Sequence, residues 1–426
     1  MNALFPIEIA GRELDSKALL AYEFATKNHV SYIGDKNSVL KFSRYVPNAV
    51  YFDKGYHKGV SEFIYKKLAV NNINLISLDE ENAVDYHDFQ QLDVRFPNHI
   101  LNKFDLIFLW GSKQYQYLKI NRSCFDTSIT FQTGHPRFEL LKKKNRSIYQ
   151  DKARELKEKY GNFVLINTNF GLGNNSKGKE FVISNYGSRF PQIKEIISYQ
   201  EKQVKLFIGL SITLSKNIEK TIILRPHPEE DIYLYKNILS KYKNIKVIRD
   251  GSVIPWIMAS SSMVHHDCTT GIESAMLGKN SIAYAKNLNK ELTTDIPLRI
   301  SYQYDNSSDV ISHIRSEEAK LIKIDNSILR DYFSFDHNSI GQIIEKTLEI
   351  FGENNTFTKN YFIYSLASFF KDKSKWFLKK NTFYEDKIQG LDFNNVQVVV
   401  NKYNRLYGGN VVVRKISSRL FQLKES

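Results

Sequence analysis

The chain has 426 residues, of which 42% are hydrophobic and 25% are charged, a composition typical of globular proteins and unlike that of disordered or fibrous chains. At about 150 residues per domain, this length predicts two or three domains and excludes a single small binding module. Sixty Lys and Arg against 46 Asp and Glu give a formal net charge of +14, which favours a polyanionic partner or an anionic membrane surface.

The two cysteines, Cys124 and Cys268, are far apart in the sequence and belong to no CxxC or Cys/His spacing. The sequence therefore predicts neither a disulfide framework nor a zinc site. No basic segment followed by an apolar stretch opens the chain, and no apolar run reaches the roughly 18 residues needed to span a bilayer. We expect a cytoplasmic protein that is neither secreted through a signal peptide nor integral to a membrane.

The first part of the chain alternates between helical and strand patterns. Residues 15–25 have helical spacing and precede an apolar stretch at 29–34 that ends in glycine. Further strand candidates, separated by helix-length segments, lie at 49–52, 74–78 and 106–110. This order predicts an α/β domain over residues 1–150, with a parallel sheet covered by helices.

A polar, basic stretch at 142–159 precedes a second series of buried-strand candidates. These lie at 163–167, 221–224, 245–248, 262–265 and 281–284. The series predicts a second α/β domain over residues 151–345.

The C-terminal part, residues 346–426, is expected to be a basic extension. Residues 359–426 contain 13 Lys and Arg and five Asp and Glu, a net charge of +8. Within them, residues 369–380 interleave aromatic side chains with lysines, as helices at membrane surfaces do. The plainer interpretation is a terminal helix whose apolar side packs on the body of the protein and whose lysines face water.

The segment Arg225-Pro226-His227-Pro228-Glu229-Glu230-Asp231 directly follows a predicted strand. Ligands of open α/β sheets bind outside the carboxyl ends of the strands, so these side chains are well placed for a site. Arg225 and His227 suit a phosphate, and the carboxylates suit acid, base or nucleophile roles. The alternative is a proline-stiffened surface loop with ordinary charges.

The segment from His265 to Lys279 indicates a strand end, a turn rich in hydroxyl groups and a short helix. Thr269 and Thr270 are suitable N-cap residues, and the free N–H groups beyond them would form an anion site. Glu273 could reach the hydroxyls of a sugar or ribose, or could cap the same helix. Neither a P-loop, a GxGxxG motif nor a serine nucleophile elbow is present.

In the first domain, Asp79, Glu80 and Glu81 follow the strand predicted at 74–78. Three acids at the carboxyl end of a strand are candidates for a general base or for binding an acceptor, or they form a solvated acidic turn. Arg12 and Glu13, at the start of the first helix, could line the same place. Lys54 and His57, in a glycine-containing loop, could face it too.

Together these segments resemble the surface-carbohydrate biosynthesis glycosyltransferases of bacteria, and in particular the retaining β-Kdo transferases that use CMP-activated ulosonic acids. The resemblance spans roughly residues 5–285 and rests on the stretches 12–15, 78–81, 133–138, 167–171, 225–231 and 268–273. It implies an α/β, GT-B-like fold with two Rossmann-type domains facing a central cleft. Transfer of Kdo or a related ulosonic acid to a lipopolysaccharide O-antigen or a capsule is the activity implied.

The resemblance also implies roles for individual residues. The donor side would comprise Arg225, His227, His265, Thr269, Thr270, Gly271 and Glu273. The acceptor side would comprise Arg12, Lys54, His57 and Asn169. Asp231 would be the nucleophile that forms a covalent glycosyl intermediate, and Glu80 or Glu81 acting as base in a direct inverting displacement is the fallback.

Two other functions fit the same motifs. Teichoic-acid polymerases share an HP pair and a hydroxyl-rich turn before a helix, which allows a CDP-glycerol or CDP-ribitol phosphotransferase. A non-catalytic glycan- or nucleic-acid-binding protein would use the basic tail. For the leading hypothesis we expect no metal, no cofactor and no nucleic acid. The expected partners are a CMP-ulosonic acid donor and a glycan acceptor, with a lipid-linked acceptor as one option. Contact of the basic tail with the inner face of the cytoplasmic membrane is a further option.

Overall fold

The structure is a computed structural model that describes residues 1–81, 85, 89–187, 190–316, 326–353, 358–374 and 382–426. The chain divides into two compact units. Unit 1 comprises Met1–Ala83, Gln91–Ile148 and Asn326–Ser426, and unit 2 comprises Val84–Gln90 and Tyr149–Asp325. Residues 375–380 of the aromatic and lysine-rich segment lie outside the described residues.

Unit 1 is built on an eight-stranded sheet in the order β13-β14-β2-β1-β3-β4-β5-β6. Its strands are β1 (Asn2–Ile7), β2 (Val30–Asp35), β3 (Val50–Asp53), β4 (Asn74–Leu78), β5 (Leu106–Leu109), β6 (Thr130–Gln132), β13 (Val411–Ser417) and β14 (Leu420–Glu425). The first six strands are parallel, as expected where helical crossovers connect buried apolar strands.

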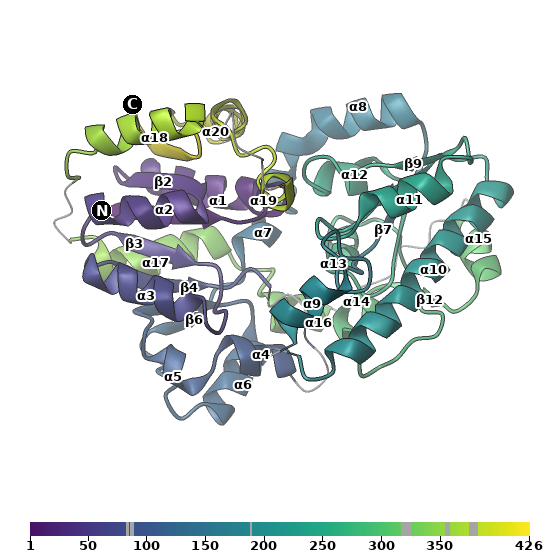
Figure 1. Cartoon of the computed structure of the whole chain (residues 1–426). Coiled ribbons are helices and arrows are strands. Elements are labelled where there is room, and N and C mark those ends of the chain that lie inside the picture. The colour runs from purple at the N-terminus through teal and green to yellow at the C-terminus, as the bar shows by residue number, and fades with distance from the viewer. Residues whose placement is uncertain (82–84, 86–88, 188–189, 317–325, 354–357, 375–381) are drawn as a thin grey trace. The chain divides into compact units, whose positions relative to one another are not determined.

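The helices of unit 1 cover both faces of this sheet (Figure 1). They are α1 (Ala10–Ala25), α2 (Lys36–Phe42), η1 (Ser43–Tyr45), α3 (Ser61–Val70), α4 (Gln90–Arg95), α5 (Asn98–Leu101), α6 (Ser112–Asn121), α7 (Pro136–Glu139), η2 (Asn145–Tyr149), α16 (Asn326–Phe333), α17 (Ser339–Phe351), α18 (Phe362–Ser374), α19 (Thr382–Lys387) and α20 (Phe393–Tyr407).

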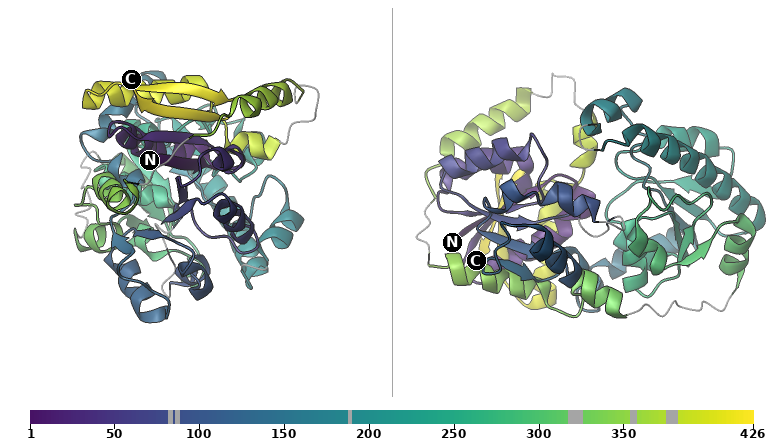
Figure 2. Two further views of the ribbon diagram at one scale, coloured as in Figure 1. Left: turned by 90° about the vertical axis from the view of Figure 1, so that its left-hand side faces the viewer. Right: turned by 90° about the horizontal axis from the view of Figure 1, so that it is seen from below.

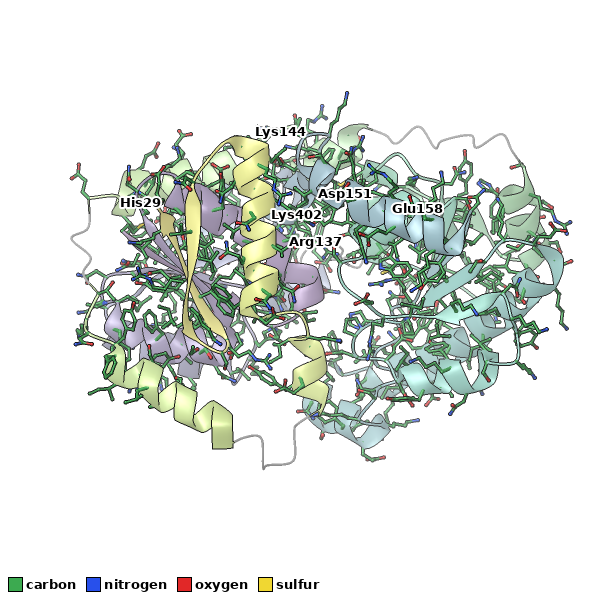
Figure 3. The ribbon with its side chains drawn as sticks, turned by 90° about the horizontal axis from the view of Figure 1, so that it is seen from above. His29, Arg137, Lys144, Asp151, Glu158 and Lys402 are labelled. Atoms are coloured by element: carbon green, nitrogen blue, oxygen red, sulfur yellow. The ribbon has the colours of Figure 1, made fainter. Side chains whose placement is uncertain are left out.

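The C-terminal residues complete unit 1, whereas the sequence suggested a separate extension from residue 346. Strand β14 pairs antiparallel with β2, so the β13–β14 hairpin covers what would otherwise be an open sheet edge. Figure 2 shows the yellow hairpin lying against the purple N-terminal strands. Helix α20, which carries Lys402 in Figure 3, packs on β13 and α1. The basic tail is therefore in part a structural element of the first domain.

Unit 2 is built on a six-stranded parallel sheet in the order β12-β11-β10-β7-β8-β9. Its strands are β7 (Val164–Asn167), β8 (Ile222–Arg225), β9 (Ile245–Val247), β10 (Ser262–His265), β11 (Ser281–Tyr284) and β12 (Tyr302–Tyr304). Its helices are α8 (Gln150–Tyr160), α9 (Lys179–Tyr186), α10 (Ile193–Asn217), α11 (Ile232–Leu239), α12 (Ile254–Ala259), α13 (Thr269–Met276), α14 (Asp295–Arg299) and α15 (Ser307–Arg315).

The long helix α10 packs its apolar stripe on the unit 2 sheet, where Phe207 and Leu214 join Val164, Ile166 and Leu224 in one core. Strands β10, β7 and β8 are parallel neighbours, so the loops that follow them lie at the same edge of the sheet. These loops carry the motifs singled out in the sequence. Among the described residues, no helix is long and apolar enough to cross a bilayer.

Candidate functional site

The loop after β8 is organised around Glu230, which is fully buried. Its Oε1 accepts hydrogen bonds from Thr168 Oγ1 (2.6 Å) and from the backbone N–H groups of Phe170 (3.1 Å) and His227 (2.9 Å). Its Oε2 accepts from the Tyr235 hydroxyl. Burial raises the pKa of Glu230 although these donors oppose the shift. Glu230 thus fixes the loop that presents His227.

Two further contacts hold the backbone of this loop. The Arg249 guanidinium donates to the carbonyl oxygens of His227 (3.1 Å), Pro228 (3.1 Å) and Glu230 (3.0 Å). The N–H of Asp231 donates to the carbonyl of Asn174 (2.8 Å), in the glycine-containing loop after β7. The loop conformation is therefore set by hydrogen bonds rather than by its two prolines alone.

Asp231 lies at the N-cap of α11 and is half-buried. Its Oδ1 accepts the N–H of Tyr233 at 2.9 Å, as an aspartate N-cap normally does. Arg225 is buried and donates to the carbonyl oxygens of Asp250 (2.7 Å) and Gly251 (3.0 Å). Burial lowers the pKa of Arg225 to about 10. Asp231, predicted as the nucleophile, and Arg225, predicted to bind the donor, therefore each make a structural hydrogen bond within unit 2.

Helix α13 begins differently from the expectation. Its N-cap is Cys268, with no side-chain hydrogen bond to the first turn, so the predicted capping by Thr269 or Thr270 is wrong. Both threonines lie inside the helix because the turn from β10 ends one residue earlier. The first turn of α13 is therefore open to a ligand that accepts hydrogen bonds.

His265 lies beneath this helix rather than at the surface. Its Nε2 is hydrogen-bonded to Ser281 Oγ (3.1 Å) and Ser301 Oγ (2.9 Å), and burial lowers its pKa to about 3. A Cβ on Gly271 would lie 2.5 Å from His265 Nε2, so only glycine lets α13 rest on the imidazole. His265 therefore supports the helix start and stays neutral.

Several buried polar atoms at this edge have no hydrogen-bond partner in the part of the chain that the structure describes. They are Asn167 Oδ1 and Nδ2, Asn169 Oδ1 and Thr270 Oγ1. Asn169 Nδ2 donates to Asp267 Oδ1 (2.7 Å), which joins the loop after β7 to the loop after β10. Buried polar groups are normally paired with protein, water or ligand. This edge of unit 2 can therefore take a polar ligand.

The carboxyl edge of the unit 1 sheet holds a network of buried charges. Glu13 lies in the first turn of α1, and its carboxylate contacts the Lys54 ammonium (3.1 Å), the Lys17 ammonium (3.2 Å) and the Arg12 guanidinium (3.3 Å). It also accepts the backbone N–H groups of residues 8 and 9. Burial favours the neutral acid, but Lys54 and Lys17 hold the pKa of Glu13 well below its usual range.

Glu80 continues the network towards β6. Its Oε1 is 3.3 Å from Lys17 Nζ and its Oε2 is 3.7 Å from His135 Nε2. His135 stacks on Trp110, and its Nδ1 accepts the N–H of Arg137 (3.2 Å), which places the proton of the neutral ring on Nε2. Burial opposes ionisation of Glu80, but Lys17 and His135 lower its pKa. Burial lowers the pKa of His135 to about 4.

Asp79 and Glu81 bind a buried arginine that the sequence did not single out. Arg95 Nε donates to Asp79 Oδ2 (2.6 Å), and its Nη1 lies 3.4 Å from Glu81 Oε2 and 3.3 Å from His57 Nε2. Gly55, at φ +123°, makes room for this arrangement, because a Cβ there would overlap Arg95 and Asp79.

Three members of the network reach solvent. The side chains of Glu8 and Glu81 are each 35% exposed and that of Arg12 is 21% exposed, whereas Lys54 is buried between Glu8 and Glu13. Lys54 lowers the pKa of Glu8 to about 2. Burial acts to raise the pKa of Glu81, but the charges of Arg95 and Arg12 outweigh it and hold that pKa well below its ordinary value. These carboxylates stay ionised at neutral pH. They are weak bases and good acceptors for hydroxyl groups.

The structure thus groups the predicted residues within each unit. In unit 1 it brings together Arg12, Lys54, His57, Glu80 and Glu81. In unit 2 it places Asn169 and His227 in the loops after β7 and β8, and Thr270 and Glu273 in helix α13, which follows β10. Arg225 and His265 are the buried last residues of β8 and β10. Sequence reasoning missed Glu8, Lys17 and Arg95, and it placed Glu230 among candidate acids, bases or nucleophiles without its structural role. Glu8 directly follows a strand, and that position was the signal that could have found it.

No protein-family model matches the sequence, and a comparison with curated proteins gives no match. Among solved structures, the wall teichoic acid polymerase TagF, as a variant soaked with CDPG, is 12% identical over 82% of this chain and 88% of its own, with a TM-score of 0.52. A second such structure is 14% identical over 83% and 90%, also with a TM-score of 0.52. A putative UDP-N-acetylglucosamine 2-epimerase from Listeria monocytogenes is 10% identical over 84% and 98%, with a TM-score of 0.50.

At these identities the likeness concerns the fold. The chain has a mixed α/β, GT-B-like fold with two domains built on parallel sheets. In the described part of the chain, no group of three or more His, Cys, Asp or Glu side chains is arranged to hold a metal ion.

Proposed function

We propose that the protein is a glycosyltransferase of bacterial surface-polysaccharide assembly that transfers Kdo or a related ulosonic acid from a CMP-linked donor to a glycan. The observation that carries this proposal is the carboxyl edge of unit 2. There an uncapped helix start, the loop held by Glu230, and the unpartnered amide of Asn167 lie on neighbouring strands and loops. Such an arrangement suits a nucleotide phosphate and a sugar.

In the proposed mechanism His227 and the first turn of α13, from Thr269 to Gly271, bind the phosphate of the donor, and Glu273 contacts the ribose. The Asp231 carboxylate attacks the anomeric carbon, the bond to the phosphate oxygen breaks, and CMP leaves with the electron pair. An acceptor hydroxyl then attacks the same carbon, loses its proton to solvent or a base, and releases Asp231. The overall result is retention.

Unit 1 would supply the acceptor side of this reaction. Its solvent-facing groups are two ionised carboxylates, Glu8 and Glu81, and the Arg12 guanidinium. Ionised carboxylates accept hydrogen bonds from sugar hydroxyls. Their lowered pKa values favour a role in binding over one as general base, so an inverting displacement driven by Glu80 or Glu81 is the less favoured route.

The decisive variant is Asp231→Asn, because asparagine caps a helix as well as aspartate does but is not a nucleophile. With CMP-Kdo as donor, we expect intact-protein mass spectrometry of the wild type to show an adduct of one sugar. We expect the variant to lose both the adduct and CMP release with an unchanged melting temperature. Asp392→Asn, which replaces the N-cap of α20 in unit 1, is the matched control. CMP release by Asp231→Asn at the wild-type rate would exclude Asp231 as nucleophile.

A second candidate is a CDP-glycerol or CDP-ribitol phosphotransferase, which the fold likeness to a teichoic acid polymerase soaked with CDPG favours. The products discriminate the two. CDP-glycerol would yield CMP and a poly(glycerol phosphate), whereas CMP-Kdo would yield CMP and a glycoside. Turnover of CDP-glycerol without turnover of any CMP-ulosonic acid would replace the first proposal with the second.

A further inference from the structure

Helix α18 presents large apolar side chains to solvent. Phe362 is 68% exposed, Ile363 is 77% exposed and Leu366 is 43% exposed. At positions i, i+1 and i+4 they lie on one side of the helix. Most large apolar residues of the described chain are buried, so three such neighbours on one helix indicate a surface that something covers.

The opposite side of α18 is firmly attached to unit 1. Tyr364 is buried and packs on Phe42 and Tyr45, and Tyr361 packs edge-on against Phe42. The N–H of Lys359 donates to the carbonyl of Tyr45 (2.7 Å). The apolar outer side therefore sits on a fixed platform rather than on a loose tail. Figure 1 shows α18 running along the outside of unit 1 beside α2.

The surroundings of this helix are basic. Three segments meet at α18: residues 36–48 of α2 and η1, residues 358–368 at its own start, and strand β13, against which it packs. Their sequences contain Lys36, Lys41, Arg44, Lys359, Arg414 and Lys415 and not one Asp or Glu. Lys41, Arg44, Lys359, Arg414 and Lys415 are exposed. Arg414 and Lys415 are successive residues of a strand and point to opposite faces of the sheet, so only one of them can adjoin α18. We call the exposed side chains of α18 together with Lys41, Arg44 and Lys359 the α18 face.

We infer that the α18 face is a docking surface for an anionic lipid bilayer. Phe362, Ile363 and Leu366 would enter the boundary between headgroups and acyl chains, while the surrounding ammonium and guanidinium groups contact lipid phosphates. The combination decides between occupants, because nucleic acid would use the cations and could stack on Phe362 but would leave the alkyl side chains of Ile363 and Leu366 in water, and a second copy of this face would repel the first. The inference does not depend on which sugar or alditol the protein transfers.

The face combines residues from both ends of the chain. The sequence assigns membrane contact to the C-terminal tail alone, whereas Lys41 comes from α2 and Arg44 from η1, near the start of the chain. The same kind of composition continues beyond α18 as Lys375-Trp376-Phe377-Leu378-Lys379-Lys380 in the sequence. The inference rests on residues 358–368 and their neighbours and not on that segment.

The test is flotation of the full chain with vesicles of phosphatidylcholine alone or of phosphatidylcholine with phosphatidylglycerol. We expect binding to the anionic vesicles at about 0.1 M salt and at least a tenfold weaker affinity for neutral ones, with most of the binding lost at about 0.5 M salt because the charges are screened. Equal binding to both vesicle types, or no binding to either, would overturn the inference.

Variants separate the two components of the face. Phe362→Ser with Ile363→Ser, and separately Lys41→Gln with Arg44→Gln and Lys359→Gln, should each weaken binding to anionic vesicles about tenfold or more. The matched apolar control is Val70→Ser with Ile120→Ser, at positions 84% and 79% exposed elsewhere on unit 1. The matched charge control is Lys103→Gln with Lys113→Gln and Lys119→Gln, also exposed.

Both controls should bind vesicles as the wild type does, and all variants should keep the wild-type melting temperature and CMP release. If the controls weaken binding as much as the face variants do, the attraction is a property of the net charge and the face is not the docking surface. If the face variants bind vesicles normally but change the sedimentation coefficient from that of a dimer to that of a monomer, the occupant is a second copy and the inference is wrong.

Discussion

The carboxyl edges of the two sheets stabilise their buried glutamates by different interactions, with charged partners in unit 1 and uncharged hydrogen-bond donors in unit 2. In unit 1, Glu13 and Glu80 are neutralised by the buried bases Lys17 and Lys54, and their pKa values are lowered. In unit 2, Glu230 is held by hydrogen bonds from uncharged donors, and burial raises its pKa. Around Glu13 and Glu80 the unit 1 edge is thus an array of charges, suited to binding hydroxyls, whereas around Glu230 the unit 2 edge is a set of positioned backbone groups.

The charge network of unit 1 can be broken most directly at its centre. In Glu13→Gln, Lys17 and Lys54 lose their shared carboxylate while staying buried, and we expect a loss of about 3–5 kcal/mol in the free energy of unfolding. Glu81→Gln, at a carboxylate 35% exposed, should cost about 1 kcal/mol or less. Urea unfolding, with hydrogen exchange at the amides of α1, measures both. Equal losses in the two variants would mean that burial does not set the strength of this network.

The geometry around Arg95 can be tested with two glycines of positive φ. Gly55 (φ +123°) faces Arg95 and Asp79, whereas a Cβ on Gly59 (φ +79°) would meet nothing within 4 Å. Gly59→Ala should therefore show the backbone strain alone, about 1–2 kcal/mol. Gly55→Ala adds displacement of a buried ion pair and should cost about 3 kcal/mol or more. If thermal and urea unfolding give the same loss of stability for the two variants, the contact of residue 55 with Arg95 does not contribute to the free energy of unfolding.

Much of this arrangement could be predicted from the order of elements, and part of it could not. Apolar runs predict strand ends at Leu78, Leu224 and His265, and the structure ends these strands at Leu78, Arg225 and His265. Parallel strands bring such ends to one edge of their sheet. The apolar residues of β1 are not identified as a strand from the sequence, so Glu8, which directly follows β1, is not predicted to lie at the sheet edge. Glu230 and Asp231 are neighbours of similar chemistry, and only the packing of Thr168 and Tyr235 decides that the first turns inward.

The position of the C-terminal residues could not be foreseen for a related reason. Strand β14 pairs with β2 across almost the whole length of the chain, and residues 411–425 show neither the length nor the turn motif that would identify their partner. Pairing of this kind depends on which sheet edge is left open in the folded protein. The same tertiary placement brings Arg95 from a short helix beside Asp79.

A pH dependence of stability is common to the two edges, because His135 in unit 1 and His265 in unit 2 are both buried with lowered pKa values, and a variant of one histidine isolates its share. His135 has a pKa of about 4 in the folded protein, below the ordinary value of 6.5, so the unfolded chain takes up a proton first as the pH falls. Unit 1 should therefore lose stability between pH 6.5 and about 4, by about 3 kcal/mol. His135→Gln should flatten this slope in urea-unfolding series, and His337→Gln, at an exposed histidine, should not. An unchanged slope in His135→Gln would contradict the assignment of the titration to this ring.

The smallest effect is expected at the start of α13, and it ties unit 2 to the proposed donor site. In Gly271→Ala the new Cβ lies 2.5 Å from His265 Nε2, and Ser281 and Ser301 hold the ring in place, so the helix start must move at a cost of about 1–2 kcal/mol. Gly209→Ala, inside α10 with open space around its Cβ, should instead stabilise the protein by up to about 1 kcal/mol. Melting temperatures should therefore change in opposite directions in the two variants.

Calorimetric titration with CMP measures the consequence for function. Because a phosphate at the first turn of α13 is sensitive to the position of that turn, Gly271→Ala should weaken CMP binding while Gly209→Ala leaves it unchanged. Equal CMP affinity in both variants would place the nucleotide away from α13.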